Sequence, residues 1–370
     1  MPCFFPNRGW LSRSKNASGK RSVVFSPAKA LLDKPMLVDC GQCTGCRMKM
    51  SQEWALRSMH EAHYYDYNLF VTLTFSESKL HKRGRFREDK ARNVFYDRTI
   101  WHMGDYTPIE WLSKYSVDVR DIQLFMKKLR QHFKYKGADG INPIRFFHCG
   151  EYGECCRVCG KSKSGLNKCQ CRVFYPSVGR PHYHMCLFNC AFDDMQFYKT
   201  NKQGNPLYTS PTLEKLWGNG FAPFGHLTYK SAAYTARYVL KKLNGKLVDE
   251  PDRFGLLPYQ RLDVNTGIIH NVDKEYTTMS RRDGVGARWL KEYWREVYPH
   301  DYIVFNGQKH SVPRYYDKLM EDIDPHMLQR VKNKRLQKAR ELAIENTPER
   351  LAVRKAISDA QLNMLTREDL

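Results

Sequence analysis

The sequence predicts an α+β fold with a central antiparallel sheet and flanking helices. Three strand-like runs, at 68–75, 144–153 and 182–188, are rich in β-branched and aromatic residues. Helical patterns separate them without the regular strand–helix–strand repeat that is typical of a parallel sheet. The chain of 370 residues is 42% hydrophobic, with 22 Tyr, 19 Phe and 7 Trp. This composition excludes a disordered protein and provides enough apolar residues for a substantial core.

In chain order, the first predicted helix covers 47–63, and the strand 68–75 follows it. Residues 76–116 are polar and irregular, which indicates an insertion. An amphipathic helix is predicted at 118–137, because its apolar side chains recur at helical spacing and its basic ones lie on the other side. The inward-facing residues are Ile122, Phe125, Met126 and Leu129, and the outward-facing ones are Lys127, Lys128 and Arg130.

The second half of the chain begins with the strands 144–153 and 182–188, which enclose a cysteine-rich insertion at 154–178. A helix is predicted at 231–245, with Ser231 as its N-cap and Gly245 at its end. Pro348, in the first turn after Thr347, indicates the start of a last helix. The charged run 329–358 is either a solvated helical tail or a contact to DNA or a partner. The predicted division is therefore an N-terminal segment 1–66, a central domain 67–245 and an extension 246–370.

The chain is strongly basic, with 61 Lys and Arg against 39 Asp and Glu, a net charge of +22. Such an excess favours polyanions, of which nucleic acid is the commonest, although a basic protein without a specific partner is the alternative. No N-terminal apolar leader and no stretch of about 20 apolar residues occurs. We therefore expect a soluble, unexported protein that does not bind membranes.

The first of two cysteine clusters is Cys40-x2-Cys43-x2-Cys46, with Cys3 upstream. A cytosolic chain keeps its thiols reduced, so a disulfide framework is not expected. A structural zinc site completed by Cys3 is the preferred interpretation. An iron–sulfur cluster is the alternative, but the fourth cysteine followed by proline is missing. Unligated thiols are the third possibility.

The second cluster combines Cys156-x2-Cys159 with Cys169-x-Cys171 and predicts a Cys₄ zinc site, with Cys155 as an alternate ligand. Free thiols are again the alternative. The same segment contains "CGKSKSG", which superficially resembles a phosphate-binding loop. That motif requires a glycine where Cys155 stands, so no nucleotide-hydrolysing motor is predicted.

Two histidines, His182 and His184, are two residues apart in the strand 182–188 and follow a Gly-Arg-Pro turn. Residues i and i+2 of a strand project from the same face. A single strand histidine is usually structural, but a pair at this spacing favours a divalent metal ion with open positions for substrate oxygens.

The helix 231–245 carries two tyrosines one turn apart, Tyr234 and Tyr238, on the side away from its apolar residues. They are either boundary residues of an amphipathic helix or nucleophiles. A tyrosine hydroxyl has a pKa of about 10, so as a nucleophile it needs a nearby cation. Lys242 and Lys241 are placed to provide one.

The motifs "FVTLTF", "RPHYHMCLF" and "YTARYVLKK" occur in an order that resembles the HUH endonucleases which start rolling-circle replication. The paired tyrosines resemble the replication initiators of microviruses. "CGQCTGCRMKMSQEWALR" and "EYTTMSRR" (275–282) are similar to those of the gokushovirus branch. This resemblance spans about residues 1 to 300.

The resemblance implies an HUH endonuclease fold with an RRM-like sheet, acting in the cytoplasm of a host bacterium on single-stranded and replicative-form viral DNA. His182 and His184 would hold Mg²⁺ or Mn²⁺, with Glu151 as the third ligand and His148 as second choice. These two differ by three positions, so a regular strand does not bring both to the metal, and a bulge at Gly150 could bring Glu151 there. One tyrosine would nick the origin through a 5′-phosphotyrosine link, and the second would allow the circle to be closed. Host helicase and DNA polymerase would be partners, and Arg180, Arg237 and Lys241 would contact DNA.

A second hypothesis from another class is a zinc-stabilised DNA-binding regulator without catalysis. It accounts for the charge and the cysteines but leaves the histidine pair and the tyrosine helix unexplained. Transposases with one tyrosine, and relaxases with tyrosines before the histidine motif, agree less well with the motif order.

Overall fold

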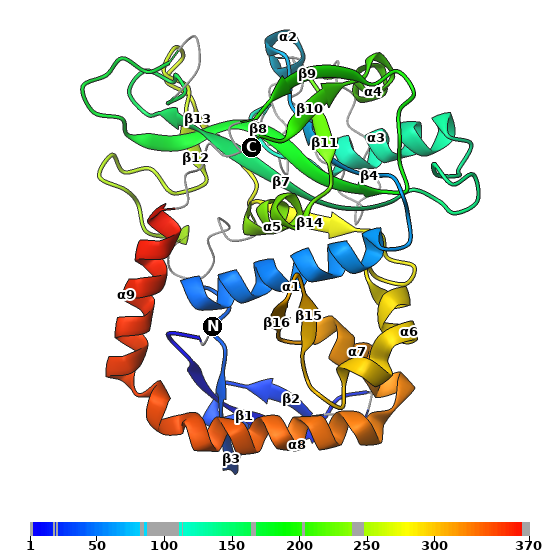
Figure 1. Cartoon of the computed structure of the whole chain (residues 1–370). Coiled ribbons are helices and arrows are strands. Elements are labelled where there is room, and N and C mark those ends of the chain that lie inside the picture. Colours follow the sequence, from blue (N-terminus) through cyan, green and yellow to red (C-terminus); the bar gives the residue numbers. More distant parts are fainter. Residues whose placement is uncertain are drawn as a thin grey trace. The chain divides into compact units, whose positions relative to one another are not determined.

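A seven-stranded antiparallel sheet is the centre of the region that carries the histidine and tyrosine motifs (Figure 1). The computed structural model describes residues 3–17, 19, 21–81, 85–86, 111–112, 114–163, 168–201, 204–238 and 248–364. The chain divides into two compact units, one of Met1–Glu53 with Tyr293–Glu368 and the other of Trp54–Glu292 with Asp369–Leu370. Among the described residues, every helix is too short or too polar to span a lipid bilayer.

The strand order in this sheet is β14-β7-β8-β4-β11-β10-β9, and all its pairs are antiparallel. The strands are β4 (Asn68–Leu73), β7 (Arg145–Cys156), β8 (Pro176–Phe188), β9 (Gln196–Thr200), β10 (Pro206–Thr209), β11 (Phe224–His226) and β14 (Tyr276–Met279). The predicted strands correspond to β4, β7 and β8, which lie side by side at the middle of the sheet. The predicted α+β class with an antiparallel sheet is thus confirmed.

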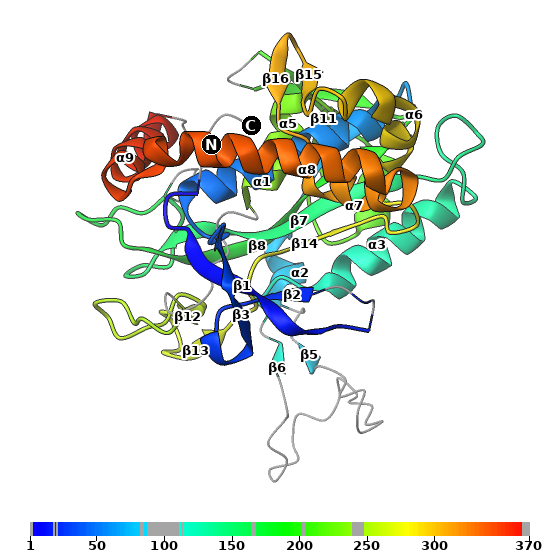
Figure 2. The ribbon, with the colours of Figure 1, turned by 90° about the horizontal axis from the view of Figure 1, so that it is seen from below.

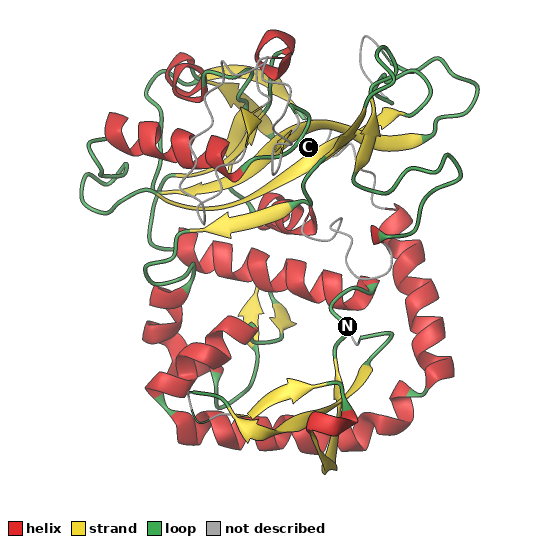
Figure 3. Ribbon diagram, turned by 180° about the vertical axis from the view of Figure 1, so that it is seen from behind, coloured by secondary structure: helices red, strands yellow, loops and turns green. Residues whose placement is uncertain are grey.

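Each face of the sheet has its own apolar core, because strand side chains alternate between the faces. Tyr183, Met185 and Leu187 of β8 join the larger core with α3 (Val119–His132) and α4 (Pro211–Trp217). Cys186 and Phe188 join a second core with α5 (Tyr229–Tyr238). Figure 3 shows the helices in red around the long yellow strands β7 and β8.

Helix α3 confirms the predicted amphipathic pattern, since its buried residues are Ile122, Phe125, Met126 and Leu129. The Asp118 side chain accepts a hydrogen bond from the Arg120 backbone N–H at 2.9 Å and caps the helix. Helix α1 (Thr44–Ala62) begins three residues before the predicted start. The small helix α2 (Glu77–His81) and the two-residue strands β5 (Arg85–Phe86) and β6 (Trp111–Leu112) are the described elements of the predicted insertion 76–116.

The predicted start of the tyrosine helix was wrong by two residues. Helix α5 begins at Tyr229, and Thr228 caps it instead of Ser231. The Ser231 N–H donates to the Thr228 hydroxyl at 3.1 Å, and the Thr228 N–H donates to the Ser231 hydroxyl at 2.9 Å. This reciprocal pair satisfies two backbone donors, as a capping box does. The expected end at Gly245 lies outside the described residues.

The unit formed by both ends of the chain contains a three-stranded sheet and several helices, which Figure 2 shows in blue and in orange to red. Its sheet has the order β2-β1-β3. Its elements are β1 (Asn7–Lys15), β2 (Arg21–Val24), the short helix η1 (Pro27–Lys29), β3 (Ala30–Val38), β15 (Ile303–Phe305), β16 (Gln308–His310), α7 (Arg314–Ile323), α8 (Pro325–Glu341), η3 (Leu342–Asn346) and α9 (Pro348–Met364). The predicted helical C-terminal part and the helix start at Pro348 are confirmed.

The remaining elements are α6 (Ala287–Val297), which spans the boundary of the two units, and the hairpin of β12 (Gln260–Leu262) and β13 (Ile269–Asn271). The hairpin belongs to the unit with the large sheet. Its turn residues lie beside the candidate site described below.

Candidate functional site

Glu151, His182 and His184 form a compact group on the face of the sheet that also carries α5. Glu151 of β7 is directly opposite His182 of β8 in the strand register. Both imidazoles approach the same carboxylate oxygen: Glu151 Oε1 is 2.6 Å from His182 Nε2 and 2.9 Å from His184 Nε2. The three ligand atoms lie within 4.8 Å of one another. Two imidazoles and a carboxylate are a donor set that suits a divalent metal ion.

The second nitrogen of each imidazole is also oriented. His184 Nδ1 is 3.0 Å from the Thr72 hydroxyl, and Thr72 of β4 is its direct neighbour in the sheet. His182 Nδ1 is 3.3 Å from the carbonyl oxygen of Arg180. Partners of this kind hold the ring and its tautomer so that Nε2 faces the ligand position. Thr72 was not predicted, since its role depends on a pairing register that the sequence does not specify.

The Glu151 carboxylate is almost fully buried, at 1% exposure. Burial raises the pKa of a carboxyl group, but the charge of His182 and hydrogen bonds from both imidazoles lower the pKa of Glu151 to about 2. The carboxylate is therefore ionised at neutral pH. A buried anion with two imidazoles against it is a favourable position for a cation.

His148, the second choice for the third ligand, lies on the opposite face of β7. Its Nδ1 is 3.0 Å from the Thr278 hydroxyl of β14, and its ring packs against Tyr276. The expected bulge at Gly150 is absent from the described strand, because the register with β8 runs unbroken from Arg145 to Tyr152. Strand alternation alone therefore brings Glu151, and not His148, to the histidine pair.

Tyr234 of α5 lies on the same side of the sheet as the histidine pair. Its ring is perpendicular to that of His184, with the ring centroids 5.0 Å apart, and it also contacts Phe70 of β4. Ala232 and Ala236 are fully buried against the sheet, and Tyr234 is half-exposed beside the histidine pair. Small residues on the packed face thus let the helix approach closely.

The structure describes the backbone, but not the side chains, of two other predicted residues of this helix. Arg237 and Tyr238 are in α5, but their side chains lie outside the described part of the structure. Lys241 and Lys242 are also outside the described residues.

We call Glu151, His182 and His184 the triad. A cleft of about 1290 Å³ contains its two histidines and Tyr234. Basic side chains from four separate segments line it: Lys114, Lys161, Arg180 and Arg261. Of these, only Arg180 was predicted as a DNA contact. Its guanidinium donates to Glu77 at 2.6 Å and to the Phe75 carbonyl oxygen at 2.7 Å, and the side chain is 47% exposed. Lys114 and Lys161 come from turn and loop segments and Arg261 from the short strand β12, where no periodic pattern identifies them.

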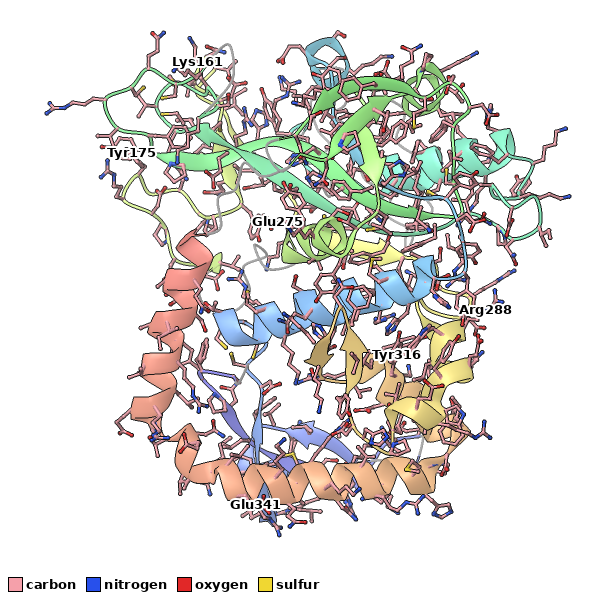
Figure 4. The ribbon with its side chains drawn as sticks, viewed as in Figure 1. Lys161, Tyr175, Glu275, Arg288, Tyr316 and Glu341 are labelled. Carbon is pink, nitrogen blue, oxygen red and sulfur yellow. The ribbon has the colours of Figure 1, made fainter. Side chains whose placement is uncertain are left out.

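The second cysteine cluster lies at the tip of the β7–β8 hairpin, where Figure 4 labels Lys161 and Tyr175. The four thiols of Cys156, Cys159, Cys169 and Cys171 lie within 4.8 Å of one another. Cys159 and Cys169 sulfurs are 3.5 Å apart, close to the roughly 3.8 Å that a tetrahedral site with Zn–S bonds of about 2.3 Å requires. Cys155 is not in the group, since its thiol donates to the Val178 carbonyl oxygen at 3.2 Å.

The first cysteine cluster belongs to the unit formed by both chain ends, and its sulfurs also lie within 4.8 Å of one another. The Cys43–Cys3 sulfur distance is 3.9 Å and the Cys40–Cys46 distance is 4.0 Å. Burial raises the pKa of Cys43, but backbone N–H groups of Cys46 and Phe4 lower it to about 7. All twelve cysteines of the chain are described, and none is in a disulfide. Both clusters can hold a metal ion.

The fold and the site thus define an α+β protein whose antiparallel sheet carries a histidine pair, a buried carboxylate and a tyrosine helix. A family model described as replication-associated protein ORF2/G2P matches residues 171–243, the segment with both histidines and Tyr234. The replication-associated protein VP4 of Bdellovibrio phage phiMH2K is 27% identical over 333 residues, which cover 89% of this chain and 81% of that protein. The replication-associated protein ORF2 of Spiroplasma virus 4 is 28% identical over 289 residues, 77% of this chain and 68% of that protein.

No solved structure matches the chain. The matches to phage replication-associated proteins nevertheless extend over most of its length. The resemblance to replication proteins of the microvirus type, predicted from the motifs, is therefore confirmed.

Proposed function

We propose that this protein acts in phage DNA replication as a site-specific, metal-dependent endonuclease and strand transferase. It would nick the origin of a small single-stranded DNA phage through a phosphotyrosine link, and later close the released circle, in the cytoplasm of the host bacterium. The observation that carries the proposal is a single cleft that contains His182, His184 and Tyr234, next to the buried carboxylate of Glu151. The phage relatives support the replication role.

The residues present are suitable for a catalytic Mg²⁺ or Mn²⁺. Glu151 is ionised, buried and shared by two imidazoles, so that its negative charge needs a cation for compensation. Glu151, His182 and His184 would hold the ion. When bound, it would polarise the scissile phosphate.

Tyr234 is proposed as one nucleophile, because its ring contacts the ring of His184. Its Oη would attack the phosphorus, so that the Tyr Oη–P bond forms and the P–O3′ bond breaks. The phenol loses its proton, and the leaving oxygen takes one up as a free 3′-hydroxyl. The 5′-phosphate stays on the tyrosine, which conserves the bond energy for a later ligation by the reverse reaction.

Tyr238, one helical turn later, is proposed as the second nucleophile, with Lys242 stabilising the tyrosine oxyanion and Arg180, Arg237 and Lys241 contacting DNA. Two nucleophiles on adjacent turns would allow one strand to be cut while the other tyrosine still holds DNA. Single-stranded and replicative-form viral DNA would be the substrates, and host helicase and polymerase would extend the 3′-end.

Both cysteine clusters are proposed as structural Zn²⁺ sites, since four thiols at tetrahedral spacing are a typical zinc donor set. Backbone N–H groups of Phe4 and Cys40 donate to the sulfurs of Cys43 and Cys3 at 3.3 and 3.2 Å. Such bonds stabilise thiolates, the form that binds zinc.

The experiment is to incubate the protein with an origin-containing single strand and Mn²⁺, and to look for a covalent protein–DNA adduct on a denaturing gel. We expect an adduct with wild type, less with Tyr234→Phe or Tyr238→Phe, and none with the double variant. Tyr229→Phe is the matched control, because it removes one hydroxyl from the same helix at its first residue.

A non-catalytic regulator is the competing function. It predicts metal-independent DNA binding and no adduct. Absence of an adduct with wild type, or equal amounts with the double variant, would disprove strand transfer.

A further inference from the structure

A second basic groove lies in the unit with the large sheet and shares no lining residue with the cleft. It has a volume of about 720 Å³ and runs between α3, the start of β7 and the end of β14. Its charged lining residues are Lys127, Arg130, Arg145, Arg281 and Arg282, and no acidic residue lines it. Arg281 and Arg282 end the "EYTTMSRR" motif, which the proposed nicking chemistry does not use.

The cations in this groove are held close together. Burial and the charge of Arg145 both lower the pKa of the Arg130 guanidinium. Arg145 is fixed by Glu61 at 2.5 Å and by the Arg282 carbonyl oxygen at 2.7 Å, so its like charge cannot move away. Arg281 and Arg282 are exposed, and the adjacent Asp283 pairs with Lys291 at 3.0 Å. Glu61 compensates the charge of Arg145, and the other four basic side chains of the lining would attract an anion into the groove.

An exposed aromatic ring stands beside these charges. Tyr135 follows the end of α3, lines the groove and is 61% exposed. Both Lys134 and Tyr135 have positive φ, at 49° and 63°, in a region that residues with a side chain rarely adopt. Backbone bonds to Gln131 and Arg130 hold them there. Strained backbone that presents a ring to solvent is typical of binding sites.

We propose that this groove binds single-stranded DNA, with the arginines on successive phosphates and Tyr135 stacked on a base. Basic side chains that follow a backbone, together with an aromatic platform, are the features by which proteins hold single strands without reading their sequence. The groove would retain DNA that flanks the nick while the cleft performs the reaction. This inference rests on the proposed function in one respect, namely that the protein acts on DNA.

The experiment measures the affinity for a fluorescent 30-nucleotide single strand without metal, so that no cutting occurs. We expect Arg281→Ala/Arg282→Ala to weaken binding about tenfold at about 0.1 M salt and to reduce the slope of log affinity against log salt by about 1.4. Lys309→Ala/Lys318→Ala is the control, because it removes two exposed positive charges from the other unit. Groove variants that bind like this control would overturn the proposal.

Three further measurements separate the alternatives. Tyr135→Asn tolerates positive φ, and we expect it to weaken binding of the normal strand but not of an abasic strand. Binding of polyglutamate, a model for an acidic protein, is measured for wild type and for the groove variants. Groove variants that lose polyglutamate binding but bind DNA as wild type does would indicate an acidic protein partner and overturn the proposal. Adduct formation on saturating short origin DNA should be unchanged in the groove variants, so failure of the nicking function is distinguished from failure of the groove.

Discussion

Glu151 and His148 are three residues apart on β7, and strand alternation gives them different environments. Glu151 faces the histidine pair, whereas His148 is fully buried on the other face. His148 donates or accepts one hydrogen bond with Thr278, and its Nε2 has no partner among the described residues. Burial lowers the pKa of His148 to about 3. It is therefore neutral in the folded protein and structural in role.

This pKa predicts a loss of stability in acid. In the unfolded chain the His148 pKa returns to about 6.5, so between about pH 6.5 and 3 the unfolded state binds an additional proton. The free energy of unfolding should be fully retained above pH 6.5 and should fall by up to about 1.4 kcal/mol per pH unit below it. His60, at a pKa of about 3 for the same reason, adds to the effect.

The measurement is urea unfolding at pH 7 and pH 5 for wild type, His148→Gln and, as control, the exposed His326→Gln. Between pH 7 and pH 5, we expect the free energy of unfolding of His148→Gln to fall by about 1 to 2 kcal/mol less than that of wild type. An unchanged pH dependence in His148→Gln would contradict the assignment.

For the triad, Glu151→Gln should weaken Mn²⁺ binding at least tenfold, because it removes the anionic ligand and leaves the imidazoles in place. The measurement is a titration of free Mn²⁺ by electron paramagnetic resonance. Glu154→Gln, which removes another carboxylate of the cleft lining, is the control and should bind as wild type does. Equal affinities for all three proteins would refute the ligand assignment.

At the scale of residues, the sequence was sufficient to identify those side chains whose chemistry is unusual for their position. Two histidines at strand spacing and two cysteine clusters identify themselves by type and separation. Thr72, Lys114 and Arg261 could not be identified, because threonines, lysines and arginines are common in strands and loops. Only the pairing register and the folded loops bring them to the site.

At the scale of elements, the β7–β8 hairpin determines the site. The 30 residues between Glu151 and His182 do not separate the two side chains, because the strands continue past the sheet and pair as far as Cys156 and Pro176. The register shifts only between Tyr152 and Glu154. Cys156 of the last pair belongs to the cysteine cluster, whose other three members lie in the loop that joins the two strands.

If zinc closes this hairpin, its removal should loosen the strand ends. We expect Cys159→Ser to bind one zinc ion fewer and to lose at least tenfold of the hydrogen-exchange protection at residues 154–156 and 176–178. Cys155→Ser is the matched control, because Cys155 is adjacent but bonds to Val178 instead of the cluster. Zinc content is measured by elemental analysis. A normal metal content in Cys159→Ser would refute the site.

The elements whose sequence has strong periodicity, such as α3, were predicted correctly. Elements whose sequence lacks periodicity were not predicted. Strands β9, β10, β11 and β14 have three to five residues each and no run of alternating apolar side chains. Their pairing depends on neighbours that are distant in sequence. The cap of α5 was misplaced because Thr228 and Ser231 are both good cap residues and share one reciprocal bond pair.

At the scale of the whole molecule, one unit consists almost entirely of Trp54–Glu292, and the other is assembled from both ends of the chain. The second arrangement was not predicted, since no sequence pattern links residues so far apart. The predicted boundaries after residues 66 and 245 stay a proposal. Within the assembled unit, Phe4, Cys43 and Cys46 pack with Leu351 of α9, and Thr44 donates to Asp359 at 2.6 Å.

The first cysteine cluster should therefore hold the C-terminal helix in place. Replacement of Cys43 by alanine removes one ligand and a buried contact of Leu351, so we expect metal loss and at least tenfold faster hydrogen exchange in residues 348–361. Exchange in α3, which belongs to the other unit, should not change and serves as the internal control. Leu351→Ala tests the packing alone: it should accelerate exchange in α9 while the metal stays bound. Slow exchange in α9 after metal loss would show that the helix is held by its other contacts, such as the Thr44–Asp359 bond, and not by the cluster.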